Sequence, residues 1–296
     1  MLDRAADLVA AALKDGLGAL PVNALERTDT IEDFKREYGE TRSLAAVNRT
    51  LGILRHAMNW GRGRMPPILV TSPFHRFGVK IKTKGESKRD RRIAPDEERR
   101  LLEAADKLNC AEHAFAGAQM RDRIVGALET GCRLGEMLKI QNRHVLWDTR
   151  QIIIPAEHAK DGESRRTPFE PKGRLAHLLK RRRFLGPKAF VFRAATGEYQ
   201  GTIRTAWESL VLLAHGIEPT RTRARGRVNR EQLADLDLHW HDLRHEAACR
   251  WLASGLDLRA IQLLLGHADL KTTQRYLNVT DEELRKTMQE KLWKRR

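Results

Sequence analysis

The sequence predicts a mainly α-helical protein with one small antiparallel β-sheet, divided into two domains. Apolar residues recur every three or four positions through most of the 296 residues, which is typical of amphipathic helices. Only residues 144–169 contain short alternating runs with turn signals between them, which is typical of strands. The break at Met65-Pro66-Pro67 separates two helical regions, and the chain is long enough for two domains.

The first of these regions is expected to bind DNA through one long helix. We expect an N-terminal helical extension over residues 1–29 and a helical DNA-binding domain over residues 30–84. A helix predicted at 43–62 has an apolar face made by Leu44, Val47, Leu51, Leu54 and Met58. Another face has side chains suited to base edges, namely Asn48, Arg55, Asn59 and Arg62. A solvated face of a helical bundle is the alternative interpretation.

The segment after the proline break carries much of the positive charge of the N-terminal third. Residues 61–93 hold ten Lys and Arg against two Asp and Glu, a net charge of 10 − 2 = +8. We expect residues 85–93 to be a basic linker, and Lys82 and Lys84 just before it to follow a phosphate backbone. A run of this kind is otherwise simply solvated.

A second domain is predicted from residue 94 to residue 296. Pro95 with acidic residues behind it is typical of a helix start, and helices are expected at 95–107 and 112–130. The motif TGCRLGE, Thr130–Glu136, follows. Arg133 stands near a helix start, where backbone N–H groups also favour an anion. Glu136 either orients Arg133 or caps the helix, and a plain surface arginine is the alternative.

The strands are predicted at His144–Trp147, Gln151–Glu157 and Ser164–Phe169. Asp161-Gly162 is a hairpin turn signal between the second and third of them. Lys160 comes directly before this turn. It is either a solvated lysine or a flexible arm that can deliver a proton to a leaving oxygen.

Two further helices are predicted at 174–183 and 202–215. Residues 219–230 read PTRTRARGRVNR and have no apolar periodicity. We expect an exposed loop that contacts DNA through Arg221 and Arg223, with disorder as the alternative.

The stretch from residue 241 to residue 276 gathers basic and phenolic side chains on short helices. These are His241, Arg244, His245, His267 and Tyr276. Gly255 and Gly266 stand where helix C-caps belong, and Asp257 is an expected N-cap. Because an arginine fork can hold two oxygens of a phosphate and a tyrosine can act as an oxygen nucleophile, the pattern favours phosphate chemistry.

Composition restricts the classes of partner and cofactor. The formal net charge of +16 indicates a polyanionic partner, and no apolar run approaches the ~20 residues of a membrane-spanning helix. The N-terminus does not resemble a signal peptide, and three cysteines without CxxC spacing favour a reducing, cytoplasmic setting. We expect no metal site and no cofactor, since neither zinc spacing nor GxxxxGK[ST] occurs.

These motifs together resemble the tyrosine recombinases, or phage-type integrases. The matching elements, in order, are TGCRLGE at 130–136, Lys160, HDLRH at 241–245, LGH at 265–267 and Tyr276. Residues 47–61, VNRTLGILRHAMNWG, followed by SPF at 72–74, resemble the helical core-binding (SAM-like) domain of that family. The resemblance covers about residues 28–290 and implies a C-terminal tyrosine-recombinase catalytic domain.

The resemblance implies a role for each matching residue. Tyr276 would attack the scissile phosphate and form a 3′-phosphotyrosyl link. Arg133 and Arg244 would clamp the non-bridging oxygens, with His267 as a further donor. Lys160 would protonate the leaving 5′-oxygen, and His241 would assist proton transfer from the tyrosine. Glu136 and His245 would support the pocket.

The resemblance also implies partners. These are double-stranded DNA with specific core sites and three further copies of the chain, in a bacterial or phage context. Accessory DNA-bending factors are compatible with it. A closing helix after the capping box Thr280-x-x-Glu283 would dock on a neighbouring protomer. Two alternatives remain open here: a non-catalytic architectural DNA-binding protein of the same fold, and a type IB topoisomerase.

Overall fold

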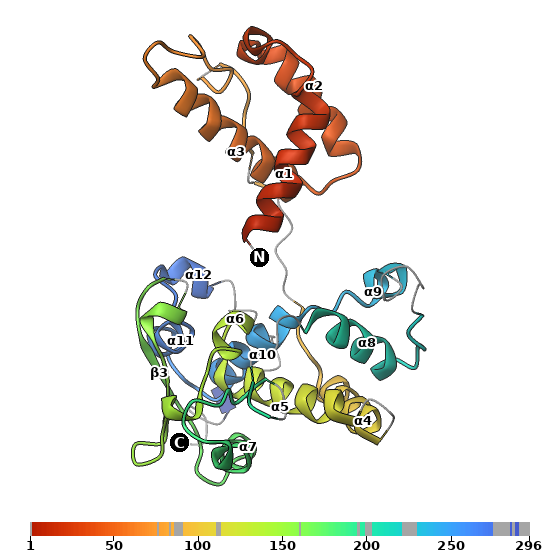
Figure 1. Cartoon of the computed structure of the whole chain (residues 1–296), viewed down its shortest axis with the longest axis vertical. Coiled ribbons are helices and arrows are strands. Elements are labelled where there is room, and N and C mark those ends of the chain that lie inside the picture. Colours follow the sequence, from red (N-terminus) through yellow and green to blue (C-terminus); the bar gives the residue numbers. More distant parts are fainter. Residues whose placement is uncertain are drawn as a thin grey trace. The chain divides into compact units, whose positions relative to one another are not determined.

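The protein forms two compact units, Met1–Arg89 and Asp90–Arg296 (Figure 1). The structure is a computed structural model. The residues that it describes are 2–75, 77–82, 84–85, 91–110, 114–159, 161–193, 196–198, 203–220, 230–274, 285 and 288–289. Each unit has its own hydrophobic core and is described by itself.

Unit 1 is built from three helices, α1 (Leu2–Leu17), α2 (Thr28–Glu40) and α3 (Leu44–Arg62). Helix α3 begins where the hydroxyl of Ser43 accepts a hydrogen bond from the N–H of Ala46 at 3.3 Å, as an N-cap does. Leu17 of α1 is buried in the same core as the apolar face of α3. Leu17, within the expected extension 1–29, therefore packs in the core of unit 1.

The apolar face predicted for α3 is largely the buried one. Val47, Leu51, Leu54 and Met58 are all buried, and Leu51 is 0% exposed. Leu44 is the exception at 40% exposed, so its expected place in the core is wrong. It is the first residue of the helix and lies beyond the edge of the core.

Unit 2 packs its helices around α5 (Ala114–Thr130). Helix α5 contacts α4 (Pro95–Cys110) and α10 (Trp240–Ala253), and its side chains Ile124 and Leu128 are buried. The other helices are α6 (Leu134–Met137), α7 (Arg174–Arg182), α8 (Arg204–Ala214), α9 (Arg230–Leu236), α11 (Leu258–Leu265) and α12 (Leu270–Gln274). The mainly helical fold class with one small sheet is confirmed.

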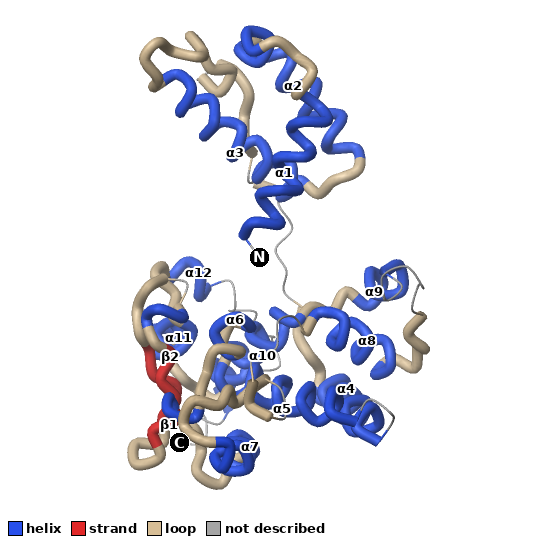
Figure 2. Tube along the Cα trace, viewed as in Figure 1, coloured by secondary structure: helices blue, strands red, loops and turns tan. Residues whose placement is uncertain are grey.

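The sheet lies at one side of unit 2, next to α11 (Figure 2). Its strands β1 (Val145–Leu146), β2 (Gln151–Ile154) and β3 (Arg165–Pro168) are antiparallel in the order β1-β2-β3. All three are shorter than predicted. Pro155 follows β2 directly and cannot donate a ladder hydrogen bond, so the strand ends there and a 3₁₀ turn follows.

The predicted ends of α11 are confirmed. The carboxylate of Asp257 accepts a hydrogen bond from the N–H of Ala260 at 2.9 Å. Gly266 has φ +64°, in the left-handed region that favours glycine, and closes the helix. This turn directs the chain back toward α10. The predicted closing helix from Thr280 falls mostly outside the described residues.

Leu51→Ala tests the core of unit 1. Removing a fully buried leucine should lower the free energy of opening unit 1 by about 2–5 kcal/mol, since a cavity replaces the side chain. Hydrogen exchange read by mass spectrometry follows each unit separately in the full chain. Ile53→Ala, on the same helix but 42% exposed, is the matched control and should change little. Equal effects of the two variants would contradict the assigned core.

Candidate active site

The motif at residues 130–136 forms a tight turn between α5 and α6. Gly131 has φ +58°, and a Cβ there would lie 2.7 Å from the ring of Trp251. Glycine is therefore required at this position. The turn leaves Arg133 at the N-cap of α6, with its side chain 26% exposed. The side chain of Arg133 thus extends from a constrained backbone and stays partly exposed to solvent.

Glu136 folds back on Arg133 from the same short helix. Its Oε2 accepts the backbone N–H of Arg133 at 3.0 Å, and its Oε1 accepts Nη1 of Arg133 at 2.8 Å. Arg165 of β3 also donates to Oε2, and Nη1 of Arg244 lies 3.9 Å from it. One buried carboxylate thus contacts three guanidinium groups.

The pKa of Glu136 reflects these contacts. Burial alone would raise the pKa of this carboxyl, but the hydrogen bond and charge of Arg165 and the hydrogen bonds of Arg133 outweigh burial. The pKa is held below its usual value, so Glu136 is ionised at neutral pH. Glu136 was predicted either to orient Arg133 or to cap the helix, and it makes both contacts. It holds the side chain of Arg133, and it caps α6 by accepting the backbone N–H of Arg133.

Arg244 lies deeper in the same pocket, on α10, and is 2% exposed. Its Nη1 donates to the carbonyl of Gly131 at 2.8 Å, which ties α10 to the turn after α5. Burying a guanidinium costs free energy unless its donors are satisfied, so these contacts keep its plane fixed.

Backbone carbonyls at the end of α11 complete the arrangement. The last carbonyls of a helix lack intrahelical partners and carry the negative end of its dipole, so cations are favoured there. Three successive carbonyls accept from three arginines: Leu264 from Nε of Arg165 at 3.1 Å, Leu265 from Nη2 of Arg244 at 2.7 Å, and Gly266 from Nη2 of Arg133 at 3.3 Å. We call these three carbonyls and the carboxylate of Glu136 the arginine socket.

His267 follows the socket and is buried. Its Nε2 lies 2.9 Å from Nη2 of Arg244, and its Nδ1 lies 3.0 Å from Oγ1 of Thr273. Because a guanidinium can only donate, Nε2 must accept, and the ring proton is therefore on Nδ1, where it donates to Thr273. Burial, and then repulsion from Arg244 and Arg133, lower the pKa of His267 to about 3.

The two other predicted histidines lie on α10. His241 is exposed, but neighbouring protein removes part of its hydration and Arg244 repels a second charge, so its pKa is lowered to about 4. His245 is buried, and its Nδ1 lies 3.8 Å from Sγ of Cys249. His245 therefore supports α10 from behind the pocket.

Arg133, Glu136, Arg244 and His267 thus gather in one place, with His241 one turn before Arg244 on α10. Lys160 and Tyr276 fall outside the described residues. The residue after Lys160 is described: the carboxylate of Asp161 lies 4.0 Å from Nη1 of Arg133, so the hairpin turn reaches this pocket.

Sequence reasoning missed Arg165 and Thr273. Arg165 alternates with exposed Arg166 in β3, and the period of two along a strand is the signal that could have separated them. Thr273 is 0% exposed and lies three residues before Tyr276. No sequence pattern singled out this threonine.

The residues predicted to contact DNA are placed differently from one another. On α3, Arg55, Asn59 and Arg62 are exposed, as are Lys82 and Lys84. Asn48 is buried, and its side-chain amide donates to the carbonyl of Lys82 at 2.7 Å, so its expected place on the exposed face is wrong. Its position in the helix turns it toward the segment that packs on α3. Arg221 and Arg223 lie outside the described residues.

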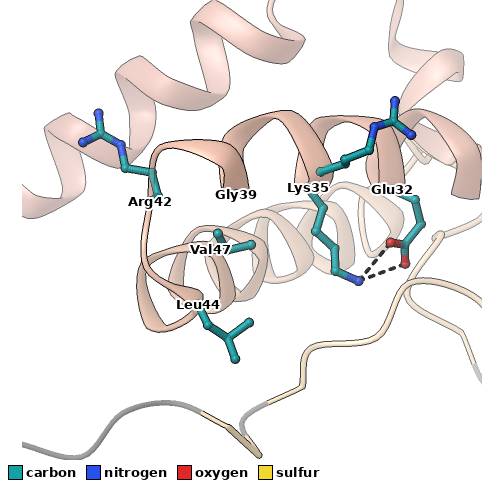
Figure 3. A pocket seen from close by; sticks show the side chains of 7 residues that line it. Glu32, Lys35, Gly39, Arg42, Leu44 and Val47 are labelled. Carbon is teal, nitrogen blue, oxygen red and sulfur yellow. Dashed lines mark hydrogen bonds and ion pairs between the residues drawn. The ribbon is translucent and has the colours of Figure 1, made fainter.

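A separate hollow occurs in unit 1 between α2 and α3 (Figure 3). It is lined by Glu32, Lys35, Arg36, Gly39, Arg42, Leu44 and Val47. Lys35 pairs with Glu32 at 2.9 Å, Arg36 pairs with Asp33 at 2.7 Å, and Arg42 lies over the ring of Tyr38. With its cations engaged in this way, the hollow offers no arrangement comparable to the socket.

The pocket of unit 2 is suited to an anion. Three arginines face the carboxylate of Glu136, and the carboxylate of Asp161 lies 4.0 Å from Arg133, so three positive charges meet two negative ones and an excess of one remains. Among the described residues, no group of three or more His, Cys, Asp or Glu is placed to hold a metal ion. In the same part of the chain, no helix is long and apolar enough to cross a bilayer.

Comparison with known proteins gives one family. The sequence profile of the Phage integrase family matches residues 91–283. Tyrosine recombinase XerD of Caulobacter vibrioides is 32% identical in an alignment of 207 positions that covers 66% of this chain and 60% of that protein. Tyrosine recombinase XerC of Azotobacter vinelandii is 29% identical over 91% of this chain and 80% of that protein. The chain spans 50–60% of the length of the first three curated relatives that it matches.

Solved structures share the fold. The integrase of the Tn1549 transposon in complex with transposon right end DNA has a TM-score of 0.64 at 15% identity, over 98% of this chain and 93% of that one. The XerH site-specific recombinase bound to palindromic difH substrate has a TM-score of 0.62 at 18% identity, over 94% of this chain and 74% of that one.

The two pocket histidines should stay neutral well below neutral pH. Because their pKa values are about 4 for His241 and about 3 for His267, NMR signals of both rings should keep the neutral-form position down to about pH 5. The variants His241→Gln and His267→Gln assign the signals. In urea the unfolded chain should titrate near the unperturbed value of ~6.5.

The same shifts give the sign of a stability effect. Between the folded and unfolded pKa values the unfolded chain binds more protons, so these histidines make folding less stable as pH falls from ~6.5 toward 4. Titration midpoints near 6.5 in the folded protein would contradict the assigned tautomer and environment.

Proposed function

Because the chain belongs to the phage integrase family, we propose that it is a site-specific DNA recombinase that cuts and rejoins strands through a 3′-phosphotyrosyl intermediate. The observation that carries this proposal is the arrangement of Arg133 and Arg244 around the arginine socket. It lies inside the matched region, which also includes Tyr276. The activity, the DNA substrate and the partners described below are parts of the proposal.

The arginines would act on the scissile phosphate. A phosphodiester carries one negative charge, and attack by a nucleophile adds charge to its non-bridging oxygens. Arg133 and Arg244 would hold those oxygens, since their forks are already fixed by the socket before the substrate arrives. Preorganised donors at a developing charge are usually the largest single contribution to catalysis.

The bond changes balance as follows. The phenol oxygen of Tyr276 forms a bond to phosphorus, and the bond from phosphorus to the 5′-oxygen breaks. The phenol proton passes to His241, which is neutral at pH 7 and can accept it. Lys160 gives a proton to the 5′-oxygen. A 5′-hydroxyl then reverses these steps on another strand and releases the tyrosine.

His267 changes partner in this scheme. In the free protein its Nε2 accepts from Arg244. A bound phosphate would offset the repulsion from the arginines, raise the pKa of His267 and favour a protonated ring that donates to a phosphate oxygen. The phosphotyrosyl bond keeps the free energy of the broken phosphodiester, so rejoining needs no nucleotide.

Unit 1 would contact the duplex. The exposed side chains Arg55, Asn59 and Arg62 lie on α3, and Arg and Asn are the residue types that pair with base edges in a major groove. Lys82 and Lys84 would contact phosphates. We propose a tetramer on two duplexes, in which each C-terminal segment docks on a neighbour. The exposed Leu263 of α11, 58% exposed, supports an apolar contact there.

Tyr276→Phe tests the nucleophile. Wild type incubated with a library of nicked suicide duplexes should form protein that carries covalent DNA after denaturation, and the Phe variant should form none, since it lacks the phenol oxygen. Sequencing the trapped DNA names the site. The control is equal binding of the trapped duplex by both proteins. Tight binding by wild type without any adduct would favour an architectural DNA-binding protein instead.

Salt dependence tests the DNA face of α3. The affinity for the trapped duplex should fall steeply with salt, because each neutralised phosphate releases counterions. Arg55→Gln should weaken binding and reduce the slope of log K against log[salt] by about 1 if Arg55 contacts a phosphate. Arg36→Gln is the matched control, since Arg36 is exposed but paired with Asp33. A flat salt response of wild type would remove the DNA interpretation.

A further inference from the structure

Arg165 is a buried arginine next to an exposed one. In β3 the side chain of Arg165 points inward and is 6% exposed, whereas Arg166 is exposed on the other face. A buried guanidinium is costly unless it is paired and hydrogen-bonded. Burial would lower the pKa of Arg165, but Glu136 outweighs burial and raises it, so the side chain stays charged.

The contacts of Arg165 join separate parts of the pocket. Its Nη2 donates to Oε2 of Glu136, and its Nε donates to the carbonyl of Leu264 at 3.1 Å. Its Nη2 also lies 4.0 Å from Sγ of Cys132. One planar fork therefore bridges the turn after α5 and the end of α11, and does so from the strand that follows the hairpin.

The closest approach is at Gly266. A Cβ built on Gly266 would lie 2.9 Å from Nη1 of Arg165, so the left-handed glycine also makes room for the guanidinium. The same glycine supplies the carbonyl that accepts from Arg133. The position of Arg165 and the position of the Arg133 fork thus depend on one turn.

Glu136 transmits the effect to Arg133. The Oε2 atom that Arg165 contacts is the atom that accepts the backbone N–H of Arg133, and the other oxygen holds Nη1 of Arg133. If Oε2 lost Arg165, the carboxylate could rotate, and both contacts to Arg133 would change. Arg165 itself is only 6% exposed, so we expect it not to contact the phosphate.

We propose that Arg165 is a positioning residue: it locks Glu136 against the end of α11 and thereby fixes Arg133 for the scissile phosphate. This inference rests on the proposed recombinase function. A lysine at this position would keep the charge but not the fork, since one ammonium cannot replace two donors aimed at Glu136 and at the carbonyl of Leu264.

The test compares Arg165→Lys with Arg166→Lys in the full chain. The probe is the nicked duplex trapped by wild type, and the readouts are the single-turnover rate of covalent adduct formation and the dissociation constant for the uncleaved duplex. Arg165→Lys should lower the rate about 10- to 100-fold, because small misplacements of catalytic groups cost this much, and should leave the dissociation constant within about twofold. Arg166→Lys makes the same change on the exposed face and should leave both unchanged.

A double-mutant cycle with Arg133→Lys separates positioning from a mere contribution to folding. If Arg165 acts through Arg133, the double variant should be no slower than Arg133→Lys alone. If the rate of the double variant instead falls by the product of the two single losses, the proposal is overturned. A wild-type rate in Arg165→Lys would also overturn it. These outcomes leave the recombinase function intact.

Folding is followed by hydrogen exchange of unit 2. If Arg165→Lys opens the unit, Arg165→Gln is the second variant, since it is uncharged and still able to donate to Glu136. Opening of the whole unit in both variants would make Arg165 a structural residue and overturn the proposal. If wild type forms no adduct with any duplex of the library, the proposed function fails, and the positioning role fails with it.

Discussion

The arginine socket is the interaction on which the proposed site of unit 2 depends. A helix end presents carbonyls that lack partners, and the chain uses three in succession to hold three arginines. Each carbonyl fixes a guanidinium through a neutral dipole, which leaves the positive charge in place. Glu136 is the one carboxylate that the three arginines share. A carboxylate cancels one unit of positive charge, whereas a carbonyl holds an arginine without that loss.

The socket also explains why residues far apart in the sequence meet. Arg133 comes from the turn after α5, Arg244 from α10 and Arg165 from β3, and each is bound to the turn closed by Gly266. Burial, and then repulsion from this concentration of positive charge, lower the pKa of His267 to about 3. The ring is then a neutral acceptor for Arg244. Under the proposed function, a bound phosphate would change this balance of charge.

Local signals predicted the fold well, and contacts between distant segments explain what they missed. Asp257 and Gly266 begin and end α11 as expected, because capping depends on a few neighbouring residues. Asn48 was assigned to the wrong face because a helix period does not reveal that the segment around Lys82 covers that side. Arg165 escaped notice because two adjacent arginines in a strand look alike until one face is known to be buried. The motifs at 130–136 and 241–245 lie more than a hundred residues apart, and spacing alone does not show that they are in contact. The family resemblance is what predicts that they form one site.

Not all of the 55 Lys and Arg side chains can face a polyanionic partner. Many arginines of unit 2 are engaged inside the protein: Arg123 donates to the carbonyl of Phe192, and Arg174 and Arg250 both pair with Glu98. Arg92 pairs with Glu246, a buried residue that directly follows His245 on α10, so this arginine helps to hold α10 in place. A basic composition therefore indicates a polyanionic partner only after such internal pairs are set aside. The exposed arginines of α3 and the socket arginines differ from these pairs, because the former face solvent and the latter share a single carboxylate.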